Sequence, residues 1–171
     1  RGTGEGLINP MVIAVTGGTG FVGRHVLALL AGQGAAVRAL ARTPAALPKQ
    51  AGVEAVQGDL TDPAALAALC EGAEGVLHIA GAISGGAAHM QRVNAEGTAT
   101  LLAAAGKAGV KRFVHVSSLA AREPELSPYA RSKAAGEAAV RAATRTLSTL
   151  IIRPPAVYGE GDRATLPLLA W

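Results

Sequence analysis

The hydrophobic positions of this chain fall into two alternating patterns. Short apolar runs, several of them rich in β-branched residues, predict strands at residues 12–16, 36–41, 53–57, 76–80, 112–116 and 149–153. Longer segments with apolar side chains at helical spacing predict helices over about 21–33, 61–70, 90–108 and 129–145. Thr61-Asp62-Pro63 predicts the start of the second of these helices, with a capping residue and a proline in the first turn. Strands that alternate with helices favour an α/β fold, a doubly wound parallel sheet with helices on its faces.

This arrangement has a consequence for where a ligand would bind. Right-handed crossovers place the carboxyl ends of all parallel strands at one edge of the sheet, and ligands of such sheets bind at that edge. Six polar or small residues stand at predicted strand ends: Thr16, Arg42, Asp59, Gly81, Ser118 and Arg153. We therefore expect the functional site at this edge.

A glycine cluster joins the first predicted strand to the first predicted helix. Gly18-x-Gly20-x-x-Gly23 matches the dinucleotide fingerprint literally, and Thr16-Gly17-x-x-Gly20-x-x-Gly23 matches it in an offset register. Glycines let the backbone turn sharply and come close to a ligand, and the amides that open a helix attract a pyrophosphate. The alternative is a flexible turn without a ligand, but the flanking strand and helix favour a dinucleotide-binding turn.

Composition and charge narrow the function further. The 171 residues are enough for one domain, which we place at residues 11–171, and residues 1–10 resemble an added leader before Met11. The net charge is +4, but the basic residues are scattered along predicted helices, which argues against a nucleic-acid partner. No apolar stretch is long enough to span a membrane. The single cysteine, Cys70, excludes an intrachain disulfide and fits a cytoplasmic location, and we assign no metal site.

A tyrosine and a lysine on the last predicted helix suggest acid–base chemistry. Tyr129 and Lys133 are four residues apart, so they share one face of that helix. A neighbouring ammonium favours the ionised phenol, which helps a tyrosine to move a proton near neutral pH. Ser118, at the preceding strand end, could hold a substrate oxygen against the phenol. A surface tyrosine beside a solvated lysine is the alternative, and the dinucleotide-type fold favours catalysis.

Taken together, these motifs resemble the short-chain dehydrogenase/reductases, in their extended or atypical branch. The branch includes epimerase/dehydratase-like enzymes and the NAD(P)H-binding accessory subunit of respiratory complex I. The matching segments, in family order, are Thr16-Gly17-x-x-Gly20-x-x-Gly23, Gly58-Asp59-Leu60, His78-Ile79-Ala80-Gly81, Val93-Asn94-x-x-Gly97-Thr98, Val116-Ser117-Ser118, Tyr129-x-x-x-Lys133 and Arg153-Pro154-Pro155-x-x-Tyr158-Gly159.

The resemblance implies a role for each matched residue. Tyr129 would be the acid/base, Lys133 would hold the nicotinamide ribose, and Ser118 would polarise the substrate carbonyl. Asn94 would support the site from its helix, with simple helix packing as the alternative, and His78 and His115 are interpreted as structural. The remaining residues would bind the cofactor: Thr16, Gly17, Gly20, Phe21, Val22, Gly23, Asp59, Leu60, Ala80, Gly81 and Arg153.

The choice of cofactor has separate support in the sequence. An NAD site usually places an acidic residue after the second strand, where it binds the ribose 2′-hydroxyl. No acidic residue stands between Ala36 and Gln50, and Arg42 occupies that neighbourhood. A guanidinium suits a 2′-phosphate by charge and geometry. The sequence therefore favours NADP over NAD, although Arg42 as a plain exposed residue is the alternative.

These observations predict an NAD(P)-dependent oxidoreductase that acts on a sugar nucleotide or a small carbonyl compound. A non-catalytic NAD(P)H-binding module, for redox sensing or complex assembly, is the alternative. No Gly-Lys-Ser/Thr phosphate loop is present, which argues against ATP or GTP. Extended members of the family continue beyond this point, and the apolar residues near Trp171 suggest a helix without its packing partners. We therefore expect a truncated substrate portion and an exposed apolar surface that can support a homodimer.

Overall fold

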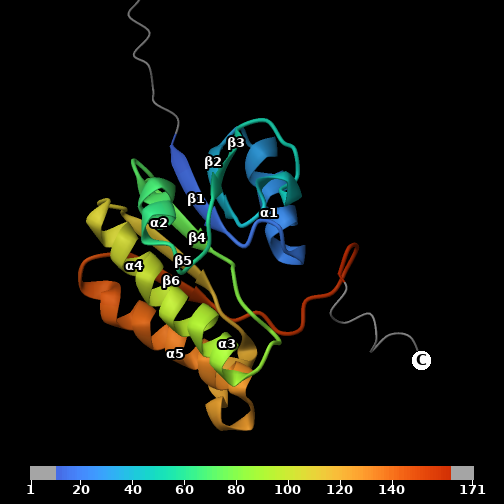
Figure 1. Ribbon diagram of the computed structural model, residues 1–171, viewed down its shortest axis with the longest axis vertical. Coiled ribbons are helices and arrows are strands. Elements are labelled where there is room, and N and C mark those ends of the chain that lie inside the picture. Colours follow the sequence, from blue (N-terminus) through green and yellow to red (C-terminus); the bar gives the residue numbers. More distant parts are fainter. Residues whose placement is uncertain (1–10, 163–171) are drawn as a thin grey trace, which may run out of the picture.

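The sheet of this protein is parallel throughout. The computed structural model describes residues 11–162, and these residues form one sheet with the strand order β3-β2-β1-β4-β5-β6 (Figure 1). The strands are β1 (Val12–Thr16), β2 (Ala36–Ala41), β3 (Val53–Gln57), β4 (Gly75–His78), β5 (Arg112–Val116) and β6 (Ser148–Ile152). This order is that of a doubly wound dinucleotide-binding sheet, with the switch point between β1 and β4. The predicted fold class is therefore confirmed.

The strand β4 ends two residues earlier than the predicted span of 76–80. His78 pairs with Thr16, the last residue of β1, and the Ile79 amide still donates to the Thr16 carbonyl (3.2 Å). Beyond that point β1 has turned into the glycine cluster, so the chain at Ala80 has no strand beside it on that side. Ile79 and Ala80 instead leave the sheet next to the glycine turn.

Helices cover the two faces of the sheet unequally. The helix α1 (Phe21–Gly32) lies on one side, where Leu27 packs with Val15 and Val37 (Figure 1). On the other side lie α2 (Pro63–Cys70), α3 (Ala87–Gln91), α4 (Gly97–Lys107) and α5 (Pro128–Ala142). Leu66, Leu101 and Val140 of these helices belong to one buried apolar cluster. Within residues 11–162, none of the helices is both long and apolar enough to span a membrane.

The long helix predicted over 90–108 is interrupted. A π-helical turn, Arg92–Glu96, separates α3 from α4, and it contains Asn94. Asn94 is almost completely buried, so this turn carries a polar side chain into the interior. The predicted helix 129–145 also ends differently, because α5 stops at Ala142 and a 3₁₀ turn continues over Ala143–Arg145. The apolar segment near Trp171 and the leader 1–10 lie outside the described residues.

The predicted start of the second helix is confirmed and gives a first test of the fold. The Asp62 carboxylate accepts hydrogen bonds from the amides of Ala64 (3.0 Å) and Ala65 (3.1 Å), and Pro63 is the first helical residue. Because the Asp62→Ala variant leaves these amides without a cap, we expect it to lower the free energy of unfolding by about 1 kcal/mol. Urea denaturation measures this loss. The Asp62→Asn variant is the matched control because asparagine caps equally well, and equal losses in the two variants would contradict the capping role.

Candidate functional site

The glycine turn after β1 depends on two close backbone approaches. Gly17 has a φ of +79°, and a Cβ at this position would lie 2.5 Å from the Ala80 nitrogen. A Cβ at Gly23 would overlap the Gly17 carbonyl oxygen and lie 2.8 Å from the Gly18 Cα. The Gly20 amide donates to the Gly17 carbonyl (3.0 Å), which closes the turn. The backbone here therefore occupies space that any side chain would fill.

The first turn of α1 presents its amide groups without a side-chain cap among the described residues. Gly20 is the N-cap, and the first turn contains no acidic residue in this part of the chain. The predicted ligand residues Phe21 and Val22 are half-buried at this end of the helix. Uncapped amides and the positive end of the helix dipole together attract an anion such as a pyrophosphate.

The carboxyl edge of the sheet carries charged groups that face solvent where β2 and β3 end. Arg42 follows β2 and Asp59 follows β3, and both are exposed. The Asp59 carboxylate accepts from the Thr61 hydroxyl (2.6 Å) and the Thr61 amide (2.7 Å), and these hydrogen bonds, with a smaller contribution from Arg42, hold the pKa of Asp59 below its usual value. Leu60 is buried and packs against Gly97. Arg42 and Asp59 are therefore close enough to interact at the place predicted for the adenosine half of the cofactor.

Thr16 has no exposed surface, unlike the other strand-end residues. Its hydroxyl lies 2.6 Å from His78 Nδ1 and accepts from the Ala80 amide at 3.3 Å. On the other side of the ring, His78 Nε2 lies 2.9 Å from the Thr98 hydroxyl, which donates to the Asn94 carbonyl (2.7 Å). The Thr16 side chain thus supports the turn from the interior, and a surface ligand would not reach it. Burial also keeps the pKa of His78 well below its usual value, so this imidazole is neutral and structural, as predicted.

Asn94 connects the chain after β4 to the helix that carries Tyr129. Its side-chain oxygen accepts from the Ala82 amide (2.7 Å), and its side-chain nitrogen donates to the Ala82 carbonyl (2.8 Å) and to the Ser132 hydroxyl (2.9 Å). Ser132 in turn donates to the Tyr129 carbonyl (2.8 Å). These bonds favour the supporting role over simple packing. Ser132 was missed as a member of this network, because a small polar residue in a helix has no distinctive sequence signal. Thr98 was matched in the segment that contains Asn94, but no role was predicted for it.

Lys133 is buried although it is charged. Only 3% of the residue is exposed, and the ammonium donates to the Val116 carbonyl at 2.9 Å. A Cβ built at Gly81 would lie 3.7 Å from Lys133 Nζ and 3.2 Å from Asn94 Oδ1. Burial lowers the pKa of Lys133 to about 8, and the nearby Glu137 carboxylate opposes that shift. Tyr129 stands one helical turn before Lys133, half-buried at the start of α5.

Ser118 lies where the sequence predicted it, at the end of β5. Its hydroxyl oxygen accepts from the Ala120 amide (3.2 Å) and caps the 3₁₀ turn Leu119–Arg122. An oxygen that accepts in this way keeps its own proton, so the hydroxyl can still donate to a substrate oxygen.

Arg153 has a partner that the sequence analysis missed. Its guanidinium donates to the Glu137 carboxylate through Nε (2.7 Å) and a terminal nitrogen (2.6 Å). Two of its five donors are therefore already used, and the predicted contact with the cofactor would fall to the rest. The spacing held a signal, since Glu137 follows Lys133 by one helical turn in an alanine-rich segment. Without a structure, that carboxylate is equally consistent with a solvated face.

The two predicted halves of the site meet at Ala80 and Gly81. Gly17 of the glycine turn packs against Ala80, and Lys133 and Asn94 lie beside the next residue, Gly81. The structure thus places the predicted anion-binding turn beside Ala80 and the lysine of the predicted acid–base pair beside Gly81. These two residues are consecutive in the segment that follows β4. A ligand lying across this segment would contact both.

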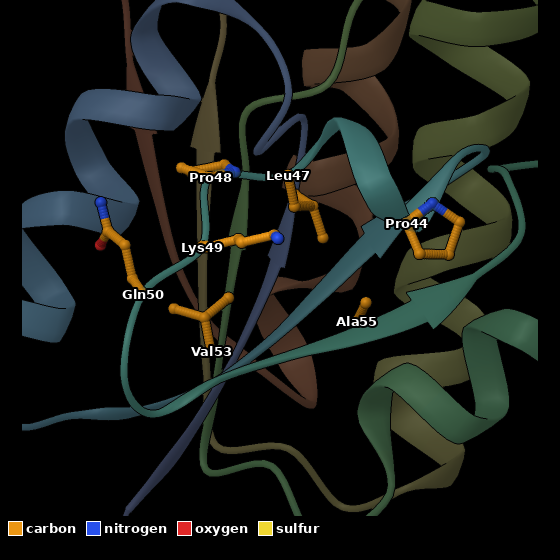
Figure 2. Close-up of a pocket in the computed structure, with 7 residues that line it drawn as sticks. All are labelled: Pro44, Leu47, Pro48, Lys49, Gln50, Val53 and Ala55. Carbon is orange, nitrogen blue, oxygen red and sulfur yellow. The ribbon is translucent and has the colours of Figure 1, made fainter.

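Two pockets in the described part of the chain flank the site. A pocket of about 430 Å³ adjoins the glycine turn and lies between α1 and the segment after β6, lined by Phe21, Val22, His25, Val26, Leu29, Val157, Tyr158, Gly159 and Glu160. A second, of about 290 Å³, lies under the connection from β2 to β3, where Figure 2 shows Lys49 between Leu47 and Val53. Neither pocket includes Tyr129 or Lys133.

Comparison with known proteins gives a consistent result. The model of the NAD dependent epimerase/dehydratase family matches residues 13–169. A ceramide reductase of Caulobacter vibrioides is 51% identical over 160 residues, which cover 92% of this chain and 50% of that protein. A 3 beta-hydroxysteroid dehydrogenase/Delta 5-->4-isomerase of Mycobacterium tuberculosis is 35% identical, covering 88% of this chain and 48% of the relative. The chain thus spans about half the length of the curated relatives it matches.

Solved structures agree with the sequence comparisons. A short-chain dehydrogenase/reductase superfamily protein from Agrobacterium tumefaciens, crystallised with bound NAD, is 36% identical to this chain. It superposes with a TM-score of 0.74 over 84% of this chain and 48% of its own length. The fold described above is thus similar to that of a protein crystallised with bound NAD.

Proposed function

Because this chain belongs to the NAD-dependent epimerase/dehydratase family, we propose that it binds a nicotinamide dinucleotide at the carboxyl edge of its sheet and takes part in oxidoreduction of a carbonyl or carbinol group. The residues present fit that cofactor. At Gly17 and Gly23 the backbone fills the space of a side chain, and the amides of Phe21 and Val22 open a helix that no side chain of the described residues caps. A backbone cradle of this kind suits a pyrophosphate.

The single observation that carries the proposal is the junction at Ala80 and Gly81. The turn that would hold the pyrophosphate packs on Ala80, and Lys133 lies beside Gly81. A dinucleotide with its phosphates on the turn would therefore bring its nicotinamide half toward Lys133 and Tyr129. A binding module without catalysis could use the lysine for the cofactor ribose, but it would have no need for a tyrosine one helical turn before that lysine.

The mechanism assigns the proton to this chain's own side chains. The cofactor, when bound, supplies or accepts the hydride. In the direction of reduction, the Tyr129 hydroxyl donates its proton to the carbonyl oxygen, and Ser118 donates a hydrogen bond to the same oxygen. The Lys133 ammonium stabilises the phenolate left on Tyr129 and can hold ribose hydroxyls of the cofactor. In the direction of oxidation, the phenolate takes the proton back.

The substrate is proposed to have a large apolar part. Two similar relatives are named for a ceramide and for hydroxysteroids, which are lipids. In this chain several large apolar side chains are exposed in the loops after β4, β5 and β6, namely Ile83, Leu119, Leu126, Val157 and Tyr158. Exposed apolar groups near a site favour an apolar ligand.

Turnover assays test this proposal directly. The intact protein, with NADPH or NADH, is assayed against long-chain ketones and steroid ketones, and in parallel against uridine and thymidine diphosphate sugars. We expect cofactor oxidation with the lipid ketones. Cofactor binding without turnover on either class would contradict the enzymatic proposal and favour a sensing or assembly module. Turnover restricted to sugar nucleotides would overturn only the substrate class.

The cofactor preference for NADP rests on Arg42 and gives a second prediction. Because an aspartate repels a 2′-phosphate and can accept from a ribose 2′-hydroxyl, we expect the Arg42→Asp variant to bind NADPH at least about tenfold more weakly and NADH more tightly. Fluorescence titration with each cofactor measures both constants. Lys107→Asp makes the same charge change at the far end of α4 and serves as the matched control. Wild-type protein that binds NADH more tightly than NADPH would overturn the preference.

A further inference from the structure

Glu137 is a buried carboxylate in the interior of α5. Only 1% of the residue is exposed, and its two oxygens receive three donors, two from Arg153 (2.7 and 2.6 Å) and one from Arg141 (2.9 Å). Burial alone would raise the pKa of Glu137, but the interactions with Arg153, Ser117 and Arg141 bring it down to about 2. The carboxylate is therefore ionised and fixed at every pH at which the protein would be assayed.

Packing gives no reason for this charge. A buried ion pair often stabilises a protein no better than apolar side chains of the same volume. Removing one partner, by contrast, leaves an uncompensated buried charge. The geometry around Arg153 indicates what the pair does instead.

The backbone on either side of Arg153 is joined to the backbone on either side of Ser118. The Ser117 amide donates to the Ile152 carbonyl (2.7 Å), and the Leu119 amide donates to the Pro154 carbonyl (2.9 Å). Arg153 and Ser118 are therefore held in register as neighbours. A residue that fixes Arg153 to α5 also fixes the segment of Ser118 to α5.

We propose that Glu137 is a positioning residue for the acid–base site. It clamps Arg153 to the helix of Tyr129 and Lys133, and so holds the Ser118 segment at a set distance from both. The inference rests on the proposed function, because Tyr129, Lys133 and Ser118 are assigned there. It adds a residue that does not touch substrate or cofactor but determines how the groups that do so meet.

Glu137 also sets the charge environment of Lys133. The groups that influence the ammonium are His78 from β4, His115 from β5 and Glu137 from α5. Burial lowers the pKa of His115 to about 4 and keeps that of His78 well below its usual value, so both imidazoles are neutral at pH 7. Glu137, balanced by Arg153 and Arg141, is then the anion that keeps Lys133 protonated. The charge of Lys133 stabilises the phenolate of Tyr129, which lies one helical turn before it.

The test changes Glu137 and Arg153, the two residues of the clamp, because their opposite charges should shift the pKa of Lys133 in opposite directions. Glu137→Gln removes the anion, so the pKa of Lys133 should fall by about one unit. Arg153→Gln removes a compensating cation and should move it upward. The pKa is read from the ¹³Cε resonance of labelled Lys133, assigned with Lys133→Arg, and needs no turnover. In both variants kcat should fall about tenfold or more, because orientation is lost. The cofactor Kd should stay within about threefold of wild type in Glu137→Gln, because Glu137 does not touch the cofactor, whereas Arg153→Gln also removes a predicted cofactor contact.

The controls separate positioning from stability. Arg141→Gln removes only the outer, largely exposed partner of Glu137. We therefore expect kcat to stay within about twofold of wild type and the pKa of Lys133 to stay unchanged. If Glu137→Gln does not fold, the double variant Glu137→Gln/Arg153→Gln removes both members of the clamp, so Arg153 is not left without its carboxylate, and it should still lower kcat. Shifts of Lys133 in the same direction in both single variants, or kcat unchanged in the folded double variant, would overturn the inference. A Tyr129→Phe enzyme with full activity would defeat the proposed function but leave the Lys133 titration to decide the clamp.

Discussion

Replacing Tyr129 by phenylalanine is expected to lower kcat by about 10²–10⁴-fold, the range that a positioned acid–base group supplies. The substitution removes the hydroxyl alone. The hydrogen bond from the Ser132 hydroxyl to the Tyr129 carbonyl and the helix start at Pro128 do not depend on it. The cofactor cradle at Gly17–Gly23 lies on a different element, so the Kd for NADPH should stay within about twofold of wild type. Steady-state kinetics and cofactor titration of the purified variant measure the two quantities.

A variant on the same helical turn serves as the control for this result. Arg131 is exposed and forms a 3.0 Å ion pair with Glu125, also exposed, so Arg131→Gln should change neither kcat nor cofactor binding. Full activity in Tyr129→Phe would remove the acid–base assignment. Loss of cofactor binding together with activity would show that the tyrosine acts through the cradle, which the separation of the two elements argues against.

The features that the sequence predicted well are those encoded locally. A run such as Val12–Thr16 followed by glycines specifies strand and turn within a dozen residues, and the cap at Asp62 depends on its immediate neighbours. For this reason the six strands and the placement of Ser118, Tyr129 and Lys133 on their elements are confirmed by the structure. The position of the site at the carboxyl edge of the sheet follows from the alternation of strands and helices. That alternation is itself predicted from local patterns along the chain.

What the sequence did not predict depends on side chains that meet across long separations. Asn94 bonds to Ser132, and that contact accompanies the π-helical turn inside a segment whose periodicity indicates one continuous helix. Thr16 stands at a strand end like its neighbours, yet its hydroxyl is taken by His78 in the interior. Arg153 also stands at a strand end, yet its guanidinium is bound to the carboxylate of Glu137, sixteen residues earlier in the chain. Polar residues at the strand ends are thus shared between the site and its internal support, and only the contacts separate the two groups.

Substituting Gly23 by alanine is expected to have the largest effect on the cofactor site. A Cβ at this position would overlap the Gly17 carbonyl oxygen and lie 2.7 Å from the Gly17 carbonyl carbon, and both atoms belong to backbone that cannot rotate away. Either the turn opens or α1 shifts, and in both cases the amides at the helix start move. We expect the Kd for NADPH to rise about 100-fold or more, and overpacking to lower the free energy of unfolding by about 1–3 kcal/mol. Fluorescence titration and urea denaturation measure the two effects.

The same helix supplies the control that makes this prediction specific. Gly32, the last residue of α1, has no atom within 4 Å of an added Cβ, so Gly32→Ala tests the same chemical change without a collision. Alanine is the better helix former by about 1 kcal/mol at an interior position, so this variant should be as stable as wild type or slightly more stable and should bind NADPH unchanged. If Gly23→Ala also bound NADPH normally, the close approach of Gly23 to Gly17 would not be what shapes the anion site. The dinucleotide would then have to be held elsewhere along the edge, and the argument from Ala80 and Gly81 to Lys133 would lose its first step.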